Sequence, residues 1–441
     1  LSSLATLSAA ADADSVNICY VTNWARHRTG LINEGRDVFE MGLETSLCTH
    51  FLYGYATVTS HFNIKSLDAE ADHPSGSVAH DQLCPDECSP WSTASLQVGA
   101  CEAPCNRDRT YRGFEALTVG ARHQSPGMKA LISVGRWHED DCPHTVREGF
   151  MCNFFAKLFS HLAESEAMIR TFAQNVIAFC RKWRFDGLNL AWLHPVLGAG
   201  APELQDYDNY ITLLRVVKEE FAAESPTSPL LLMATVGVMR HVVDAAYNVP
   251  EMNNHLDLIN LMTYDLHGHW ETSTGCNANL YATSEDASRT ATGGQPAYPL
   301  SVSWAVDRWI ELGASPAKLT LGVATYGRGW KLATASQAGY GAPAIGASAP
   351  AISTRQAGLM AYYEITELVQ SGRAVRSYDA DRQCPYVVTA GGDWIGYDDA
   401  ESLQAKVDFA RQRGLRGMML WSLDLDDFGG AYSGGGRVPP P

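Results

Sequence analysis

Eight short runs of β-branched and other apolar residues recur along the chain, and most are separated by segments long enough to form a helix. Strands that alternate with helices favour a parallel sheet, and eight of them are enough to close that sheet into a (β/α)8 barrel, the TIM barrel. We therefore predict an α/β protein built on such a barrel. The runs are Ile18–Thr22, Thr49–Ala56, Lys129–Val134, Phe185–Leu190, Leu230–Val236, Leu258–Met262, Leu319–Ala324 and Gly417–Trp421.

Two long segments interrupt this alternation. Residues 57–112 lie between the second and third runs and are rich in cysteine, proline and serine, and residues 331–393 lie between the seventh and eighth. We assign residues 17–330 and 394–430 to the barrel, residues 331–393 to a small insertion domain and residues 431–441 to a C-terminal tail.

The charge balance excludes several classes of partner. The 441 residues carry a formal net charge of −16, whereas binding to phosphate groups needs clustered lysine and arginine. No apolar run of roughly 20 residues is present, so membrane insertion is not expected. We predict no nucleic-acid partner, and the sequence indicates neither a cofactor nor a metal.

The eleven cysteines favour an oxidising compartment. Cys84, Cys88, Cys101 and Cys105 lie in a segment with little apolar residue content, and either disulfides or a zinc ion would stabilise it. We favour disulfides because the other cysteines are scattered singly. The odd count leaves at least one thiol unpaired or paired with another chain, and Cys180 is our candidate, on the apolar side of a helix predicted from Ser165 to Trp183.

The first residues carry a weak targeting signal. Residues 1–16 begin with a small, apolar stretch that ends near Ala13 and has an Ala-x-Ala character. Such a stretch is typical of the end of a secretory signal peptide, and a flexible mature N-terminus is the alternative. Together with the cysteines, it leads us to expect a secreted, extracellular protein.

Phe185–Pro195 and eight other segments along the chain resemble motifs of the family 18 glycoside hydrolases, the chitinases. The segment Phe185–Pro195 is similar to the family's DGxDxDxE strand. The resemblance implies a (β/α)8 barrel with a small α+β insertion domain between strands seven and eight, and a disulfide between Cys19 and Cys48. The other segments are Cys19–Trp24, Cys48–Ala56, Ser133–Trp137, Met262–Glu271, Thr325–Arg328, Ala361–Ile365, Trp394–Ser402 and Leu420–Phe428.

The catalytic positions of that strand carry no carboxylate in this chain. Where the family pattern has Asp, Asp and Glu, the chain has Asn189, Ala191 and Leu193. Because side chains alternate along a strand, we expect these three to share one face that points at the pocket, and we expect His194 to face away from it. In the family the Glu is the general acid and the substrate's N-acetyl oxygen is the nucleophile. We therefore expect no catalytic residues and no hydrolysis, since losing a general acid alone costs about 10²–10⁴-fold in rate.

The same resemblance implies a set of sugar-contacting side chains. Trp421 would form the floor under the central sugar, and Tyr264 and Asp265 would meet its N-acetyl group. The alternative for Tyr55 and Tyr326 is that they belong to the barrel core. The implied ligand-binding residues are Trp24, Tyr55, Trp137, Tyr264, Asp265, Trp270, Tyr326, Arg328 and Trp421.

Arg136 stands where the family has glycine, and we expect it to crowd the cleft or to pair with a carboxylate such as Asp265. The leading hypothesis is a secreted, catalytically inactive lectin that binds N-acetylglucosamine-containing glycans, chitin or chitooligosaccharides. The alternative is a structural or interaction scaffold with an occluded cleft, a protein partner or a homo-oligomeric state. A third hypothesis is a residual chitinase that uses His194 or Asp265 as its acid.

Overall fold

The computed structural model describes residues 3–9, 15–28, 43, 45–72, 113–135, 152–197, 203–289, 297–427 and 430–432. In these segments, eight parallel strands form a closed sheet, because β1 pairs with both β2 and β15 and every other strand has a neighbour on each side. This confirms the predicted (β/α)8 barrel. Its strands are β1 (Val16–Thr22), β2 (His50–Val58), β4 (Lys129–Gly135), β5 (Gly187–Ala191), β6 (Leu231–Val236), β7 (Leu258–Leu261), β8 (Leu319–Ala324) and β15 (Gly417–Trp421).

The strand β5 begins two residues later than predicted because Asp186 has another role. Its Oδ2 accepts hydrogen bonds from the backbone N–H of Ala130 at 2.8 Å and from Arg122 Nη2 at 2.6 Å. This side chain ties the start of β5 to β4 at the opposite end of the barrel from the carboxyl ends of the strands. Asp186 is therefore structural.

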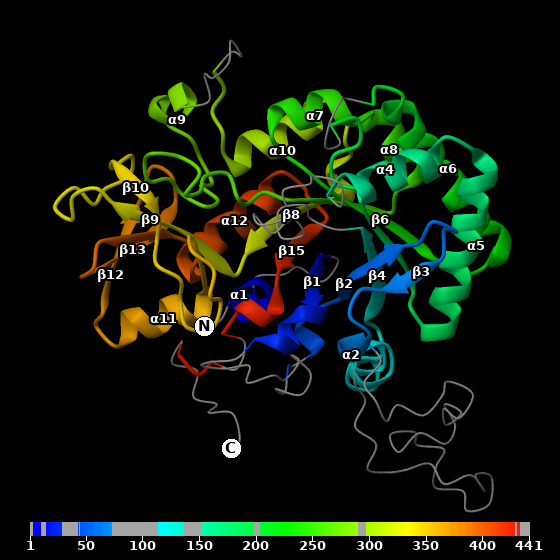
Figure 1. Ribbon diagram of the computed structural model, residues 1–441, viewed down its shortest axis with the longest axis horizontal. Helices are drawn as coiled ribbons and strands as arrows, with labels where there is room; N and C mark the ends of the chain where they lie inside the picture. Colours follow the sequence, from blue (N-terminus) through cyan, green and yellow to red (C-terminus); the bar gives the residue numbers. More distant parts are fainter. Residues whose placement is uncertain are drawn as a thin grey trace, which may run out of the picture.

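Helices surround the barrel on its outer side, as Figure 1 shows for α5, α6 and α8 at the right. Helix α5 covers Glu166–Trp183, close to the predicted bounds, and buries Phe172, Val176 and Cys180 against the sheet. The others that connect barrel strands are α3 (Arg122–Gln124), α4 (Cys152–Ala163), α6 (Asp206–Glu224), α7 (Arg240–Ala246), α8 (Val249–His255), α9 (Ser284–Arg289), α10 (Val302–Glu311) and α12 (Ala400–Gln412).

A second, antiparallel sheet lies between β8 and β15 in the chain and at the left of Figure 1. Its first strand follows β8 after a single residue, Thr325, and its last strand ends at Gly396. The sheet therefore extends beyond both ends of the predicted segment 331–393. It contains β9 (Tyr326–Leu332), β10 (Ala344–Ala347), β11 (Leu359–Ala361), β12 (Ala374–Asp379), β13 (Cys384–Thr389) and β14 (Asp393–Gly396), with helix α11 (Tyr362–Gln370) against it.

The N-terminal segment includes a helix that packs on the barrel. Helix α1 (Ser3–Ala9) buries Leu7, and the backbone N–H of Ser3 donates to Asp426 Oδ1 at 3.1 Å. The prediction of a flexible segment for residues 1–16 therefore does not apply to α1. At the start of the cysteine-rich segment, β3 (Ile64–Ser66) pairs antiparallel with β2, and α2 (Ala69–Asp72) follows it.

The cysteines confirm the implied pairing and add another. Cys19 is bonded to Cys48, which ties β1 to the segment before β2. Cys276 is bonded to Cys384, a pairing that the sequence did not suggest. Cys180 is the free cysteine of the described segments, as predicted, and burial raises the pKa of its thiol. Cys84, Cys88, Cys101 and Cys105 lie outside the described residues.

None of the helices in the described segments combines the length and the apolar composition that a membrane span requires.

Candidate functional site

A cavity of about 510 Å³, which we call the cleft cavity, lies at the carboxyl ends of the barrel strands. Residues at or just beyond the ends of β1, β2, β5, β6, β7 and β15 line it, together with residues of the second sheet. The loops at this end of a (β/α)8 barrel carry the active site in essentially every enzyme with this fold. The predicted site residues are therefore expected at this cavity.

Three aromatic residues form one side of the cavity, and we call them the aromatic floor: Trp24, Tyr55 and Trp421. The ring centroid of Trp421 lies 5.9 Å from that of Tyr55 and 6.2 Å from that of Trp24, and Trp24 and Tyr55 stack at 6.0 Å. Tyr20 meets Trp421 edge-on at 4.7 Å. Because each ring is held by the others, the floor is a rigid, largely apolar surface with the geometry on which sugar faces can stack.

Asp265, which follows β7, is held by two side chains of β9. Its Oδ1 accepts hydrogen bonds from the Tyr326 hydroxyl at 2.6 Å and from Arg328 Nε at 2.7 Å, and its Oδ2 accepts one from Arg328 Nη2 at 2.7 Å. The backbone N–H of Asp265 donates to Asn277 Oδ1 at 2.9 Å. When a guanidinium donates two parallel hydrogen bonds to a carboxylate, it holds the carboxylate in one orientation and compensates its negative charge. Arg328 is thus a partner of Asp265 within the described residues, and the expected pairing with Arg136 falls outside them.

Three tyrosines combine a buried ring with a place in the cavity lining. Tyr55, Tyr264 and Tyr326 are 4%, 7% and 3% exposed, yet each lines the cavity. Burial raises the pKa of all three phenols well above the usual value of 10. Their hydroxyls therefore stay protonated at neutral pH and remain hydrogen-bond donors. The two alternatives for Tyr55 and Tyr326, cavity lining and core, both apply.

Asn189 lies inside the barrel, where four polar side chains surround its amide. Its Nδ2 donates to the Tyr20 hydroxyl and to Ser133 Oγ, both at 2.8 Å. Its Oδ1 accepts from Thr235 Oγ1 and Asn260 Nδ2, both at 3.2 Å. Both N–H groups and both lone pairs of the amide are therefore used, which a carboxylate could not achieve because it cannot donate. Asn189 is well suited to a neutral, buried network.

Of the three positions at which the resemblance implied catalytic carboxylates, Leu193 alone is among the described residues that line the cavity. Asn189 is deeper in the barrel, and Ala191 is buried where β5 meets β4. At that point Gly135 has φ +129°, and a Cβ on it would lie 2.3 Å from the carbonyl oxygen of Ala191. Asn189 and Ala191 are thus not among the residues that line the cavity, although Asn189 accepts a hydrogen bond from Thr235, which does line it.

The prediction for His194 is wrong, because His194 lines the cavity beside Leu193. Strand β5 ends at Ala191, so the alternation of side chains does not continue to these residues. The ring of His194 lies against Gly237, where an added Cβ would come within 3.1 Å of Nε2.

Seven of the nine implied ligand-binding residues line the cavity, and Trp270 does not. Trp270 lies outside the lining, is 52% exposed and has the guanidinium carbon of Arg328 5.3 Å from its ring centroid. Trp137 and its neighbour Arg136 lie outside the described residues. The residues that do line the cavity are Trp24, Tyr55, Tyr264, Asp265, Tyr326, Arg328 and Trp421.

Further residues of the lining were not predicted from the sequence. Arg28 lines the cavity and forms an ion pair with the buried Asp424. Thr354 and Gln356 contribute polar groups from the second-sheet domain. Their position in that domain, far from any barrel strand in the sequence, gave no signal of a role at the site.

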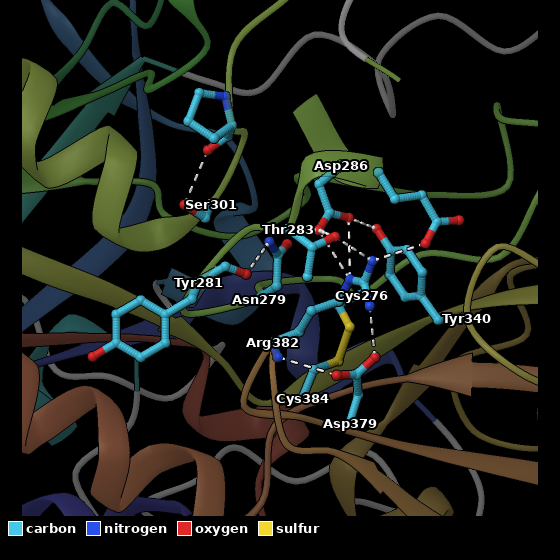
Figure 2. A network of polar contacts seen from close by, with 12 residues as sticks. Cys276, Asn279, Tyr281, Thr283, Asp286, Ser301, Tyr340, Asp379, Arg382 and Cys384 are labelled. Atoms are coloured by element: carbon cyan, nitrogen blue, oxygen red, sulfur yellow. Dashed lines mark hydrogen bonds and ion pairs between the residues drawn. A yellow bond between two sulfur atoms is a disulfide. The ribbon is translucent and has the colours of Figure 1, made fainter. Parts of the chain in front are cut away.

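Figure 2 shows how the segment after β7 is attached to the second-sheet domain around Arg382. The guanidinium of Arg382 donates to Asp286 at 3.0 Å and to Asp379 at 2.9 Å, and its carbon lies 3.6 Å from the ring centroid of Tyr340. The adjacent Cys276–Cys384 disulfide makes a covalent link between the same two segments. Cys276 precedes Asn277, the residue that orients Asp265, so this cluster supports the geometry at the cavity.

The family model of the glycosyl hydrolases family 18 matches residues 16–426, and the chain belongs to this family. The chain is 32% identical over 425 residues to oviduct-specific glycoprotein of sheep (Ovis aries). This alignment covers 96% of the chain and 65% of that relative, so the relative is considerably longer.

Two solved structures show that the same fold occurs with and without reported activity. The immunomodulatory active chitinase of Trichuris suis superimposes with a TM-score of 0.75 and 28% identity, covering 96% of this chain and 97% of the other. Human YKL-39 superimposes with a TM-score of 0.73 and 27% identity, covering 96% and 97%, and is described as a pseudo-chitinase with retained chitooligosaccharide-binding properties. Activity must therefore be argued from the residues of the site.

Proposed function

We propose that this protein is a chitinase-like lectin, which binds N-acetylglucosamine-containing glycans such as chitooligosaccharides in the cleft cavity and does not hydrolyse them. One observation carries the proposal: the side chain of Leu193 lines the cavity at the position of the family's general acid, while the aromatic floor lies in the same cavity.

Hydrolysis needs a proton for the leaving oxygen and a group that steadies the attacking N-acetyl oxygen. Leu193 has no proton to donate, and the methyl group of Ala191 forms no hydrogen bond. Among the described residues that line the cavity, Asp265 is the carboxylate, and both of its oxygens accept hydrogen bonds from Arg328. A carboxylate held in this way is suited to accept a hydrogen bond from a ligand and poorly suited to deliver a proton.

Recognition of a sugar needs an apolar face and a few oriented polar groups. The floor of Trp24, Tyr55 and Trp421 provides the first, and the pair of Asp265 and Arg328 with the Tyr264 hydroxyl provides the second. Human YKL-39, with its reported retention of chitooligosaccharide binding, supports this separation of binding from cleavage.

We also propose that the protein is secreted. The disulfides Cys19–Cys48 and Cys276–Cys384 are of the kind that form and persist in oxidising compartments. The similarity of the chain to oviduct-specific glycoprotein of sheep also supports secretion.

Isothermal titration with chitohexaose, followed by chromatography of the ligand after prolonged incubation, tests both parts of the proposal. We expect a saturable binding isotherm with a dissociation constant in the micromolar range and recovery of intact chitohexaose. Shorter oligosaccharides in the recovered ligand would contradict the absence of hydrolysis, and a flat isotherm would contradict the lectin.

A further inference from the structure

A buried carboxylate lies behind the aromatic floor. Asp72, the last residue of α2, is 2% exposed and is not among the described residues that line the cleft cavity. Its Oδ2 accepts a hydrogen bond from Asn23 Nδ2 at 3.4 Å, and the same Nδ2 donates to the carbonyl oxygen of Tyr55 at 3.3 Å. Asn23 immediately precedes Trp24 in the chain. One amide group therefore connects Asp72 to two of the three residues of the floor.

Two other side chains hold the Asp72 carboxylate. Its Oδ1 accepts a hydrogen bond from the Tyr53 hydroxyl at 2.7 Å, and its Oδ2 accepts one from Ser66 Oγ at 2.6 Å. Tyr53 lies on β2, and Ser66 lies on β3, where it is in register with Ala56 of β2. The carboxylate is thus fixed to two strands at the point where it meets the segment that carries Trp24.

This segment contacts the region of α2 at a second point. Trp24 lies on a short 3-10 helix, η1 (Asn23–His27). At the far end of η1 the side chain of His27 pairs with Asp68, whose Oδ1 accepts a hydrogen bond from the backbone N–H of Ala71 at 3.0 Å. The helix that carries Trp24 is therefore attached at both of its ends to residues 68–72, and its position depends on theirs.

The protonation of Asp72 indicates that this residue arranges its neighbours rather than stabilises the fold at neutral pH. Burial raises the pKa of its carboxyl to about 6, and the charge of Asp68 acts in the same direction. At pH 7 the carboxylate is therefore mostly ionised in surroundings that favour its neutral form, which costs stability. An ionised carboxylate accepts hydrogen bonds from all three donors at once, because it has no proton of its own to place. Its contribution is to orient these donors, and Asn23 is the donor beside the floor.

A binding site gains affinity when its side chains are held in the bound arrangement before the ligand arrives. We propose that Asp72 is a positioning residue for glycan binding, which acts through Asn23 to hold Trp24 and Tyr55 in place for the sugar rings. Asp72 does not itself contact the ligand. This inference rests on the proposed function and deepens it, because it assigns a residue behind the cavity to the same recognition.

Fluorine NMR of the full chain, labelled with fluorotryptophan, reports on the floor without any ligand, and Trp24→Phe assigns the resonance of Trp24. We expect Asp72→Ala to shift and broaden this resonance, because the ring loses its support, and to leave the resonance of Trp304 on α10 unchanged. Asp206→Ala is the matched control, because Asp206 is 3% exposed and accepts hydrogen bonds from Ser160 Oγ at 2.7 and 2.8 Å, but lies on α6. It should leave the Trp24 resonance unchanged.

Titration calorimetry with chitohexaose at pH 7 measures the effect on binding. Asp72→Ala should weaken binding at least about fivefold, the factor to which one net hydrogen bond corresponds, whereas Asp206→Ala should stay within about twofold. Asn23→Ala should weaken binding by a similar factor, and the double variant should weaken it no further, because both residues act through one contact. Asp72→Asn, which keeps an acceptor oxygen, should lie between Asp72→Ala and the unchanged protein.

An unchanged Trp24 resonance in Asp72→Ala, equal changes in the Asp72 and Asp206 variants, or additive losses in the double variant would overturn the positioning role. If Asp72→Ala does not fold, Asp72→Asn and Asp206→Asn replace the alanine pair, with the same contrast expected in the Trp24 resonance. If the unchanged protein does not bind chitohexaose, the proposed lectin function fails, while the fluorine spectra still test whether Asp72 holds the floor.

Discussion

The ends of β5 and β7 differ in the polar side chains that they carry. At the end of β5, Ala191 and Leu193 offer a methyl and an isobutyl group where the family has carboxylates. At the end of β7, Asp265 is oriented by Tyr326 and Arg328 of the neighbouring strand. In our proposal, proton transfer and ligand recognition depend on different strands of one barrel, so a chain can lose the first and keep the second.

The largest expected effect on stability is that of removing the carboxylate of Asp265 at the end of β7. Asp265→Ala leaves the guanidinium of Arg328, whose side chain is 9% exposed, without its carboxylate partner. Removing one member of a buried ion pair destabilises a protein by about 3–5 kcal/mol, because the other charge stays buried. Urea unfolding at pH 7 measures this loss, and chitohexaose affinity should fall with it.

Asp307→Ala is the matched control, because the ion pair of Asp307 with Arg413 is solvent-exposed. Its loss should change the free energy of unfolding by less than about 1 kcal/mol. Equal losses in the two variants would mean that the Asp265 pair is not the oriented, buried element described above.

A second test concerns Asp72, which supports the segment before Trp24. Its carboxylate accepts hydrogen bonds from Ser66 Oγ at 2.6 Å, Tyr53 Oη at 2.7 Å and Asn23 Nδ2 at 3.4 Å. Burial nevertheless raises the pKa of Asp72 from 3.8 to about 6.

The Asp72 carboxyl holds its proton more tightly in the folded protein than in the unfolded chain. Its contribution to the free energy of unfolding is therefore complete below about pH 4. It is lost as the pH rises through 6, by up to about 3 kcal/mol. Asp72→Asn should flatten the decline of stability between pH 4 and pH 7, as measured by urea unfolding at several pH values. A decline of the same steepness in the variant would show that Asp72 does not cause it.

Trp421→Ala tests the aromatic floor. Large aromatic residues at the centre of a binding site typically contribute about 2 kcal/mol or more, so chitohexaose should bind roughly 30-fold more weakly. Trp304→Ala, at a half-buried tryptophan on α10 that packs on Tyr298, is the control and should leave the affinity unchanged. An unchanged affinity in Trp421→Ala would show that the aromatic floor is not part of the proposed binding site.

The smallest effect is expected at the emptied end of β5. Leu193→Met conserves both volume and apolar character, so the free energy of unfolding should change by less than about 1.5 kcal/mol. The affinity for chitohexaose should stay within about twofold, because this position does not serve sugar recognition in our account. A large loss of affinity, measured by titration calorimetry, would show that sugar recognition also depends on the end of β5.

The barrel could be predicted because each of its strands is a compact apolar run between helices, as Leu319–Ala324 and Gly417–Trp421 are. The start of the second sheet could not, because Thr325 alone separates β8 from β9 and no break in composition marks where the chain leaves the barrel. The start of β5 was misplaced because the Asp186 side chain takes the backbone N–H of Ala130.

At the cavity, the family's motifs placed the aromatic floor and Asp265 near the ends of barrel strands, where the structure also has them. The motifs did not locate Val238, Met239 and Val242, because apolar residues after a strand are indistinguishable in sequence from the start of a core helix. The lining position of His194 was missed because the period of a strand was applied beyond Ala191, where the strand ends.

Native mass spectrometry of the protein with chitohexaose distinguishes a lectin from an enzyme, because it reads binding and cleavage in one spectrum. The account predicts a one-to-one complex whose ligand mass remains that of intact chitohexaose after days of incubation at neutral pH. Complexes that carry shorter oligosaccharides, or free shorter products that increase with time, would show that the end of β5 has not lost its chemistry.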